Sequence, residues 1–314
     1  MTRMFTKPTF RWPCLVGMIL RVAMVMNAAE AAKPIKGIGP KGPVREVYSD
    51  CLFTEGPVAL DGGSLLFTDI PSARIMKVDS RGKVTTFRKN SHFANGLMLN
   101  TKGELCACEM DGQVVAISLD TGKRRVIAAT YQGKRFNAPN DLVVDRAGGI
   151  YFTDPNFRAP KPLPQGVLGV YYISSEGHAT RLIDDLPNPN GVILSPDEKT
   201  LYVIPTGQAE MMAYPVSRPG TLGKGRVFCR LKQPPGQSGR GGDGLTIDSK
   251  GNLYIASALG LQVFSPSGGL LGIIAFPKQP ANATFGGPRH QTLFVTARST
   301  VYSVEMEARG LKTH

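Results

Sequence analysis

Short apolar stretches alternate with turn residues along most of this chain, and no long stretch shows the apolar spacing of an amphipathic helix. One unit recurs six times. It has a short polar opening, an apolar strand of three or four residues, a turn rich in Asp, Gly, Lys or Pro, and a second strand of stronger β propensity. These segments occupy residues 54–70, 93–109, 138–154, 188–204, 241–257 and 280–296.

Most units continue with a third alternating strand, such as "GVYYISS", and several with a fourth, such as "GKVTTF". An oxygen-bearing residue opens every unit, and successive openings are 39 to 53 residues apart. A period of about 45 residues with four short strands is typical of a β-propeller blade. We therefore predict an all-β fold, a six-bladed β-propeller with four-stranded antiparallel blades over residues 45–308.

The two ends of the chain lie outside this repeat. Residues 1–31 combine a basic start, an apolar stretch and small residues around Ala29 to Ala31, which predicts a secretory signal peptide and export to the periplasm or beyond. Arg21 interrupts the apolar stretch, so we expect no lasting membrane anchor. Residues 32–44 are interpreted as a linker and residues 309–314 as a C-terminal tail.

Composition and charge narrow the class of protein. The 42% apolar residues, 36 Gly and 24 Pro are typical of a globular, turn-rich chain. The net charge of +13 comes from scattered Lys and Arg without a nucleic-acid-binding motif, so we interpret it as a solvated basic surface and expect no nucleic-acid partner. The sequence leaves the oligomeric state open.

The five cysteines show no zinc-site spacing. Cys106 and Cys108 are two residues apart on one predicted strand and point the same way, so they do not bridge each other. Cys51 and Cys229 pair only if the fold brings them together, which the sequence leaves open.

The residues that open the units predict a ligand site. In a propeller the first strand of each blade lines the central channel, so the polar residue before each strand reaches the same mouth. Carboxylate and amide oxygens are ligands that Ca²⁺ prefers, and the absence of His and Cys at these positions argues against zinc or copper. The six residues are Glu55, Asn95, Asn140, Asn190, Asp243 and Asn282.

A turn is the alternative interpretation, because Asn-Gly and Asp-Gly are common turn dipeptides. A hairpin Asn-Gly joins two strands, however, whereas these dipeptides precede the first strand of a unit. This difference favours a ligand role for Glu55, Asn140, Asn190 and Asp243. For Asn95 and Asn282 a turn and a substrate-binding role both stay open.

Four motifs resemble the senescence marker protein 30/gluconolactonase/luciferin-regenerating-enzyme-like (regucalcin-like) family: "EGPVAL", "PNDLVVDRAGGIYFTDP", "PNGVILSPDEKTLYV" and "GGDGLTIDSKGNLYIAS". The resemblance implies a hydrolase that opens a lactone, foremost a gluconolactonase-type sugar lactone, with a Ca²⁺ centre that also accepts Zn²⁺, Mn²⁺ or Mg²⁺. The implied metal ligands are Glu55, Asn140, Asn190 and Asp243.

The resemblance also implies individual roles. Asp243 is the expected general base, and related propellers place Asp141 beneath the site, in support of it or at a second, structural calcium. Animal members carry an arginine two residues before the position of Asn140, where this chain has Ala138. The sugar-hydroxyl contacts of that arginine are therefore not expected here.

Several residues keep two interpretations. Glu109 either contacts substrate hydroxyls or is a solvated hairpin residue, and residues 156–169 form either a rim of the site or a plain loop. Asp69 and Asp154 are expected to cap loops away from the metal. Without a Gly-x-Ser-x-Gly motif a serine esterase is not expected. The alternative function is a non-catalytic extracellular binding propeller with a structural metal.

Overall fold

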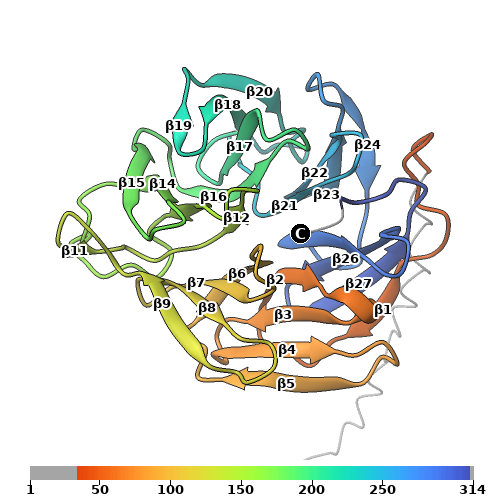
Figure 1. Ribbon diagram of the computed structural model, residues 1–314. Helices are drawn as coiled ribbons and strands as arrows, with labels where there is room; N and C mark the ends of the chain where they lie inside the picture. The colour runs from red at the N-terminus through yellow and green to blue at the C-terminus, as the bar shows by residue number, and fades with distance from the viewer. Residues whose placement is uncertain (1–33, 312–314) are drawn as a thin grey trace, which may run out of the picture. The chain divides into compact units, whose positions relative to one another are not determined.

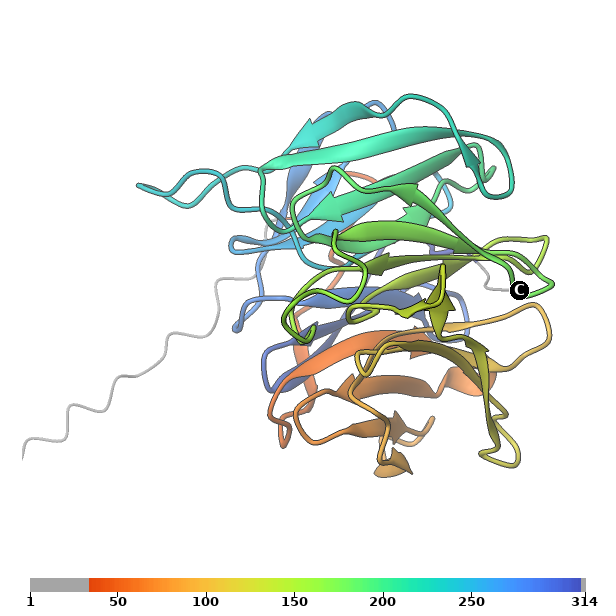
Figure 2. The ribbon, with the colours of Figure 1, turned by 90° about the vertical axis from the view of Figure 1, so that its left-hand side faces the viewer.

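The computed structural model describes residues 34–311 of the 314-residue chain. These residues belong to one compact unit, in which six antiparallel sheets surround a common axis (Figures 1 and 2). The predicted all-β, six-bladed propeller is confirmed. The predicted signal peptide, residues 1–31, lies outside the described residues. Within residues 34–311, no helix is long and apolar enough to cross a membrane.

Each of the first three blades is a four-stranded meander, as predicted. Blade 1 contains β2 (Thr54–Ala59), β3 (Leu65–Asp69), β4 (Arg74–Val78) and β5 (Val84–Lys89), with the 3₁₀ turn η1 (Asp61–Gly63) after β2. Blade 2 contains β6 (Ala94–Leu99), β7 (Leu105–Glu109), β8 (Gln113–Ile117) and β9 (Arg124–Ala128). Blade 3 contains β12 (Leu142–Val144), β13 (Ile150–Asp154), β14 (Gly169–Ile173) and β15 (Ala179–Ile183).

The remaining sheets add two irregular features. A small hairpin connects blades 2 and 3 and contains β10 (Thr130–Tyr131) and β11 (Lys134–Arg135). Blade 4 has five strands rather than the predicted four: β16 (Pro189–Leu194), β17 (Thr200–Pro205), β18 (Glu210–Arg218), β19 (Thr221–Leu222) and β20 (Arg226–Arg230). The nine-residue β18 is long enough to pair with both β19 and β20, which accounts for the additional strand. Blade 5 contains β21 (Leu245–Ile247), β22 (Leu253–Ser257), β23 (Gly260–Phe264) and β24 (Leu270–Ile274).

The two ends of the propeller sequence meet in blade 6. Its strands are β25 (Asn282–Gly286), β26 (Thr292–Ala297), β27 (Thr300–Glu305) and, from the other end of the chain, β1 (Arg45–Tyr48). β1 pairs antiparallel with β27, with Glu46 opposite Tyr302, and Figure 1 shows the two strands side by side. This pairing closes the ring, because the last repeat has only three strands of its own.

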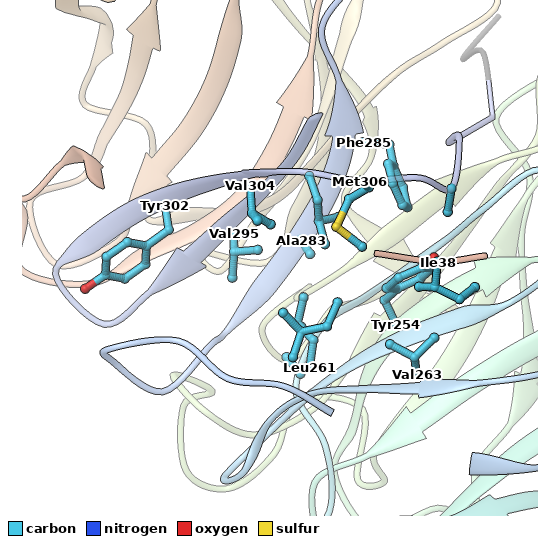
Figure 3. Packing of buried hydrophobic residues seen from close by; sticks show 14 of the residues in the cluster. Ile38, Tyr254, Leu261, Val263, Ala283, Phe285, Val295, Tyr302, Val304 and Met306 are labelled. Atoms are coloured by element: carbon cyan, nitrogen blue, oxygen red, sulfur yellow. The ribbon is translucent and has the colours of Figure 1, made fainter. Parts of the chain in front are cut away.

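Hydrophobic clusters fill the spaces between neighbouring blades. Between blades 5 and 6, Tyr254, Leu261 and Val263 face Ala283 and Val304 (Figure 3). Ile38, from the segment predicted as a linker, is 4% exposed within the same cluster. At the other end of the chain, Gly310 forms a β-bridge with Asp248. Both flanking segments therefore pack against the propeller over the residues that the structure describes.

The four cysteines among the described residues are free thiols. Cys106, Cys108 and Cys229 are buried, and Cys51 is half-buried. Burial raises the pKa of Cys229 to about 12, so this thiol stays protonated near neutral pH. Cys51 and Cys229, whose pairing the sequence left open, are not joined.

We expect the closing segment to contribute directly to stability. A chain that begins at residue 49 loses β1 and Ile38, and burial of one large aliphatic side chain alone contributes ~1.5–3 kcal/mol. Its free energy of unfolding should be at least ~3 kcal/mol below that of a chain beginning at residue 34, as measured by urea unfolding with circular dichroism. Equal unfolding free energies for the two chains would contradict closure by β1.

Candidate metal centre and substrate pocket

The Asn-Gly and Glu-Gly dipeptides lie inside strands, not in hairpin turns. Asn95 and Gly96 belong to β6, and Asn190 and Gly191 belong to β16. In both strands the pairing register shifts across the dipeptide, and β2 shifts in the same way after Glu55. Each shift is a β-bulge, a feature that turns a side chain away from its regular direction. The bulges are the local reason why these polar side chains face the channel mouth.

The glycines that follow are required by close approach of neighbouring blades. A Cβ atom on Gly56, whose φ is 45°, would lie 1.9 Å from the carbonyl oxygen of Asn95. A Cβ atom on Gly244 would lie 2.1 Å from Cγ of Asn282. Only glycine leaves room for these contacts, so the inner strands meet at their polar ends.

Backbone hydrogen bonds connect the blades at this level. The Gly96 N–H donates to the Asn140 carbonyl over 2.8 Å, and the Gly191 N–H donates to the Asp243 carbonyl over 3.1 Å. The candidate ligands on blades 3 and 5 are thus held by the glycines of blades 2 and 4. The spacing between ligands is set by backbone rather than by long, flexible side chains.

Three threonines, which the sequence analysis missed, extend these connections. The Thr153 hydroxyl of blade 3 donates to the Asn190 carbonyl of blade 4 over 2.6 Å. Thr68 makes the equivalent bond to the Asn95 carbonyl at 3.1 Å, and Thr206 bonds the Gly242 carbonyl at 2.9 Å. The available signal was the recurrence of Thr near the end of the second strand in blades 1, 3 and 4.

Asp69 and Asp154 cap loops, as expected, but these loops adjoin the candidate site rather than lying away from it. The carboxylate of Asp154 accepts hydrogen bonds from the N–H groups of Asn137 (2.8 Å) and Ala138 (2.7 Å). Asp69 accepts from the N–H groups of Leu52 and Phe53. These loops lead directly into Asn140 and Glu55, so the two aspartates orient the segments that deliver site residues.

The four candidate metal ligands line one cavity of about 300 Å³ at the mouth of the channel. Asn95 lines the same cavity, and Phe157 and Arg158 bring the loop 156–169 to its edge. At least this part of the loop therefore forms a rim. The remaining lining residues are Phe53, Ile70, Pro71, Met110 and Thr206.

Two of the other predicted residues lie deeper. Asp141 and Asn282 line the central channel, a cavity of about 180 Å³ among the inner strands. Nδ2 of Asn282 is 3.5 Å from Oδ2 of Asp141, and the Leu142 N–H donates to Oδ1 of Asp141 over 2.9 Å. Asp141 thus lies beneath the candidate metal centre, where it can support the site.

Glu109 is not among the residues that line the cavity at the mouth. Its carboxylate forms a two-pronged ion pair with Arg124 and is almost fully buried. Arg135 lies near the position of the missing family arginine, and its guanidinium already has hydrogen-bond partners. Its guanidinium donates to the carbonyls of Phe136 and Asn137.

The carboxylates at the site destabilise one another in their charged form. Burial, followed by the charges of Asp243 and Asp141, raises the pKa of Glu55 well above its usual value. Burial raises the pKa of Asp243 to about 6, against the hydrogen bond that Nδ2 of Asn190 donates to its Oδ1 over 2.7 Å. Burial also raises the pKa of Asp141 to about 7.

The donor set fits a hard divalent cation. Across residues 34–311, no Lys or Arg forms an ion pair with Glu55, Asp141 or Asp243, and Arg298 acts on Asp243 only through its charge, which lowers the pKa of that carboxyl. The same residues contain no group of three or more His, Cys, Asp or Glu arranged to hold a metal. A metal at this mouth would therefore be held by a mixed set of carboxylate and amide oxygens, which suits Ca²⁺ better than Zn²⁺.

The fold and the site define a six-bladed propeller with oxygen ligands at the mouth of its channel. The chain belongs to the SMP-30/Gluconolactonase/LRE-like family, whose model matches residues 53–299. It is 30% identical to a gluconolactonase of Zymomonas mobilis over 85% of this chain and 82% of that protein. A lactonase of Staphylococcus saprophyticus is 31% identical over 75% of this chain and 73% of its own length.

Solved structures agree with this assignment. A gluconolactonase from Xanthomonas campestris superposes with a TM-score of 0.77 at 31% identity, covering 84% of this chain and 89% of that one. A calcium-binding regucalcin from Agrobacterium tumefaciens has a TM-score of 0.74 at 21% identity, covering 86% of this chain and 95% of its own. This second similarity establishes the shared fold.

We expect Thr153→Val to loosen the site. The substitution leaves the buried Asn190 carbonyl and the Asp141 N–H without the hydroxyl, and an unpaired buried polar group costs ~1–3 kcal/mol. Thr180→Val, on the exposed face of β15, is the matched control and should change the unfolding free energy by less than ~0.5 kcal/mol. Equal stability of Thr153→Val and the control would show that the inter-blade hydroxyl is dispensable.

Proposed function

We propose that this protein is a divalent-metal-dependent lactonase of the gluconolactonase type, with Ca²⁺ as its preferred metal. The observation that carries the proposal is the convergence of Glu55, Asn140, Asn190 and Asp243 on one cavity, where no Lys or Arg of residues 34–311 forms an ion pair with the two carboxylates. The lactonases and gluconolactonases among its relatives, about 30% identical over most of the chain, support the reaction class.

In this proposal the four residues hold the metal through two carboxylates and two amide oxygens. When bound, the cation supplies Lewis-acid polarisation of the lactone carbonyl and neutralises the oxyanion that forms on attack. Zn²⁺, Mn²⁺ and Mg²⁺ are expected substitutes. The chain's own contribution is to keep the ligands at fixed spacing and to place a base beside them.

Asp243 is the proposed base. Its Oδ1 is held by the Asn190 amide, so Oδ2 is the oxygen left to accept a proton from the attacking water. Burial raises its pKa from the usual range of an aspartate towards neutral pH, which suits a general base. The Thr206 hydroxyl, 3.0 Å from Nδ2 of Asn190, fixes the amide that positions Asp243.

The reaction then balances in two steps. The water oxygen bonds to the carbonyl carbon while Asp243 takes its proton, and the ring C–O bond breaks as that proton passes to the leaving alkoxide. The product is the open hydroxy acid, which ionises in solution. Asn95, another polar residue on the cavity wall, is the proposed substrate contact.

Calcium binding should be visible without any substrate. At a Ca²⁺ concentration about 100 times the dissociation constant, binding adds ~2.7 kcal/mol to the folded state and raises Tm by roughly 5 °C. Glu55→Gln should remove most of this shift, whereas Glu46→Gln on the exposed edge strand β1 should keep it. A full Ca²⁺ shift in Glu55→Gln would contradict the proposed ligand set.

Hydrolysis tests the role of Asp243. With D-gluconolactone as the first substrate and a panel of other lactones beside it, Asp243→Asn should lower kcat by about 100-fold or more, the usual contribution of a general base. Chelation should abolish wild-type activity and added Ca²⁺ should restore it.

An unchanged rate in Asp243→Asn would contradict the mechanism. If the wild type opens no lactone but keeps its Ca²⁺ shift, the non-catalytic binding propeller with a structural metal becomes the better account.

A further inference from the structure

The outer wall of the cavity has little hydrogen-bonding capacity. Five of its lining residues are apolar, and the polar ones other than Arg158 are the four candidate ligands, Asn95 and Thr206, whose hydroxyl is bonded to Asn190. A polyhydroxylated substrate needs several donors and acceptors, which this wall does not offer. The apolar residues are Phe53, Ile70, Pro71, Met110 and Phe157.

Arg158 is the single cationic residue among those that line the cavity. It comes from the loop after β13, and its guanidinium carbon lies 3.7 Å from the ring centroid of Phe93. Stacking of this kind fixes the plane of the guanidinium and leaves its edge N–H groups free to donate.

Both partners of this stack are held in place. Phe93 has a φ of 55°, and Asn90 and His92 in the same short loop also have positive φ values of 53°. Non-glycine residues in this region carry strain that the surrounding structure must offset, and such residues cluster at binding sites. The Arg158 loop is tied down by Gln165, whose side-chain amide donates to the carbonyls of Lys134 and Arg135.

Arg158 also lacks an acidic partner within residues 34–311. Arg74 and Arg124 pair with Asp69 and Glu109, the guanidinium of Arg135 is bound to backbone carbonyls, and Arg298, whose charge lowers the pKa of Asp243, donates to the side chain of Gln279. Arg158 makes no such pair and is exposed at the rim. A positioned, uncompensated guanidinium on an otherwise apolar wall is suited to a carboxylate.

On the basis of the proposed lactonase function, we propose that Arg158 binds a carboxylate carried by the substrate. The preferred substrate class is then a lactone with an anionic substituent on a largely apolar frame. The lactone carbonyl lies at the candidate metal centre, and the carboxylate reaches Arg158 at the rim. Arg158 thereby determines specificity and takes no part in bond cleavage.

The alternative ligand of Arg158 is the carboxylate that ring opening creates in the product. The two ligands differ in what Arg158 affects. If Arg158 binds a carboxylate of the substrate, its removal lowers kcat/KM for carboxylate-bearing lactones alone. If it binds the carboxylate of the product, its removal changes product inhibition with every lactone.

The test compares two γ-lactones that differ only in a carboxymethyl or a carbamoylmethyl substituent, each measured with the Ca²⁺-loaded full chain. Wild type should favour the carboxymethyl lactone by about tenfold in kcat/KM, mostly through KM. Arg158→Gln should remove this preference and leave the neutral lactone within twofold. Phe93→Leu, which removes the aromatic face under the guanidinium, should reduce the preference about threefold.

Arg81→Gln, at the exposed turn between β4 and β5, is the matched control and should behave as wild type. Binding of the open hydroxy-dicarboxylate, measured by calorimetry, gives a readout that needs no catalysis and should weaken about tenfold in Arg158→Gln. Equal loss for both lactones, loss of neither, or an effect confined to inhibition by product overturns the inference. If the wild type opens no lactone, the lactonase proposal fails, and unchanged dicarboxylate binding in Arg158→Gln then overturns this inference as well.

Discussion

The close approach of the inner strands at one end of the channel is the constraint on which the rest of the structure depends. Blades packed around a single axis bring their first strands together, and in four of the six blades the approach leaves no room for a Cβ atom at Gly56, Gly96, Gly191 and Gly244. Because the residue before each of these glycines carries an oxygen, the approach concentrates carboxylates and amides in a small volume. The chemistry of the site therefore follows from how the ring closes.

This concentration has an electrostatic consequence. Glu55, Asp141 and Asp243 are three acids in a poorly solvated region, and burial raises the pKa of each. Proteins keep such groups charged by pairing them or by binding a cation, and no ion pair reaches them from residues 34–311. A divalent ion is the simplest solution, and in the proposed function it would also supply a Lewis acid for opening the lactone. Binding of such a cation would therefore affect both the stability of the folded propeller and the reaction at its mouth.

Much of the fold and of the candidate site could be predicted from the sequence, because the blades of a propeller repeat the same pattern of residue types at a regular period. The six in-register openings predicted both the fold and the cavity that Glu55, Asn140, Asn190 and Asp243 line. Closure of blade 6 by β1 was not predicted, since it pairs segments about 250 residues apart that share no pattern. The last repeat's missing fourth strand was the available clue.

The interaction partners of individual side chains were harder to predict than the positions of the residues in the fold. Glu109 satisfied the spacing of a substrate contact, but its ion pair with Arg124 depends on two rotamers meeting across β8. Thr153 was overlooked because its hydrogen bond joins two blades. Arg158 lies in an irregular loop, where neither periodicity nor propensity indicates direction, and only the three-dimensional contact with Phe93 reveals its orientation.

The four oxygen-bearing residues at the mouth of the channel are proposed to hold one divalent metal. A crystal of the protein grown with Mn²⁺ or Ca²⁺ and measured for anomalous scattering tests it most directly. We expect a single strong anomalous peak enclosed by Glu55, Asn140, Asn190 and Asp243. A crystal with ordered side chains and no peak there, or with its metal bound elsewhere on the propeller, would contradict it.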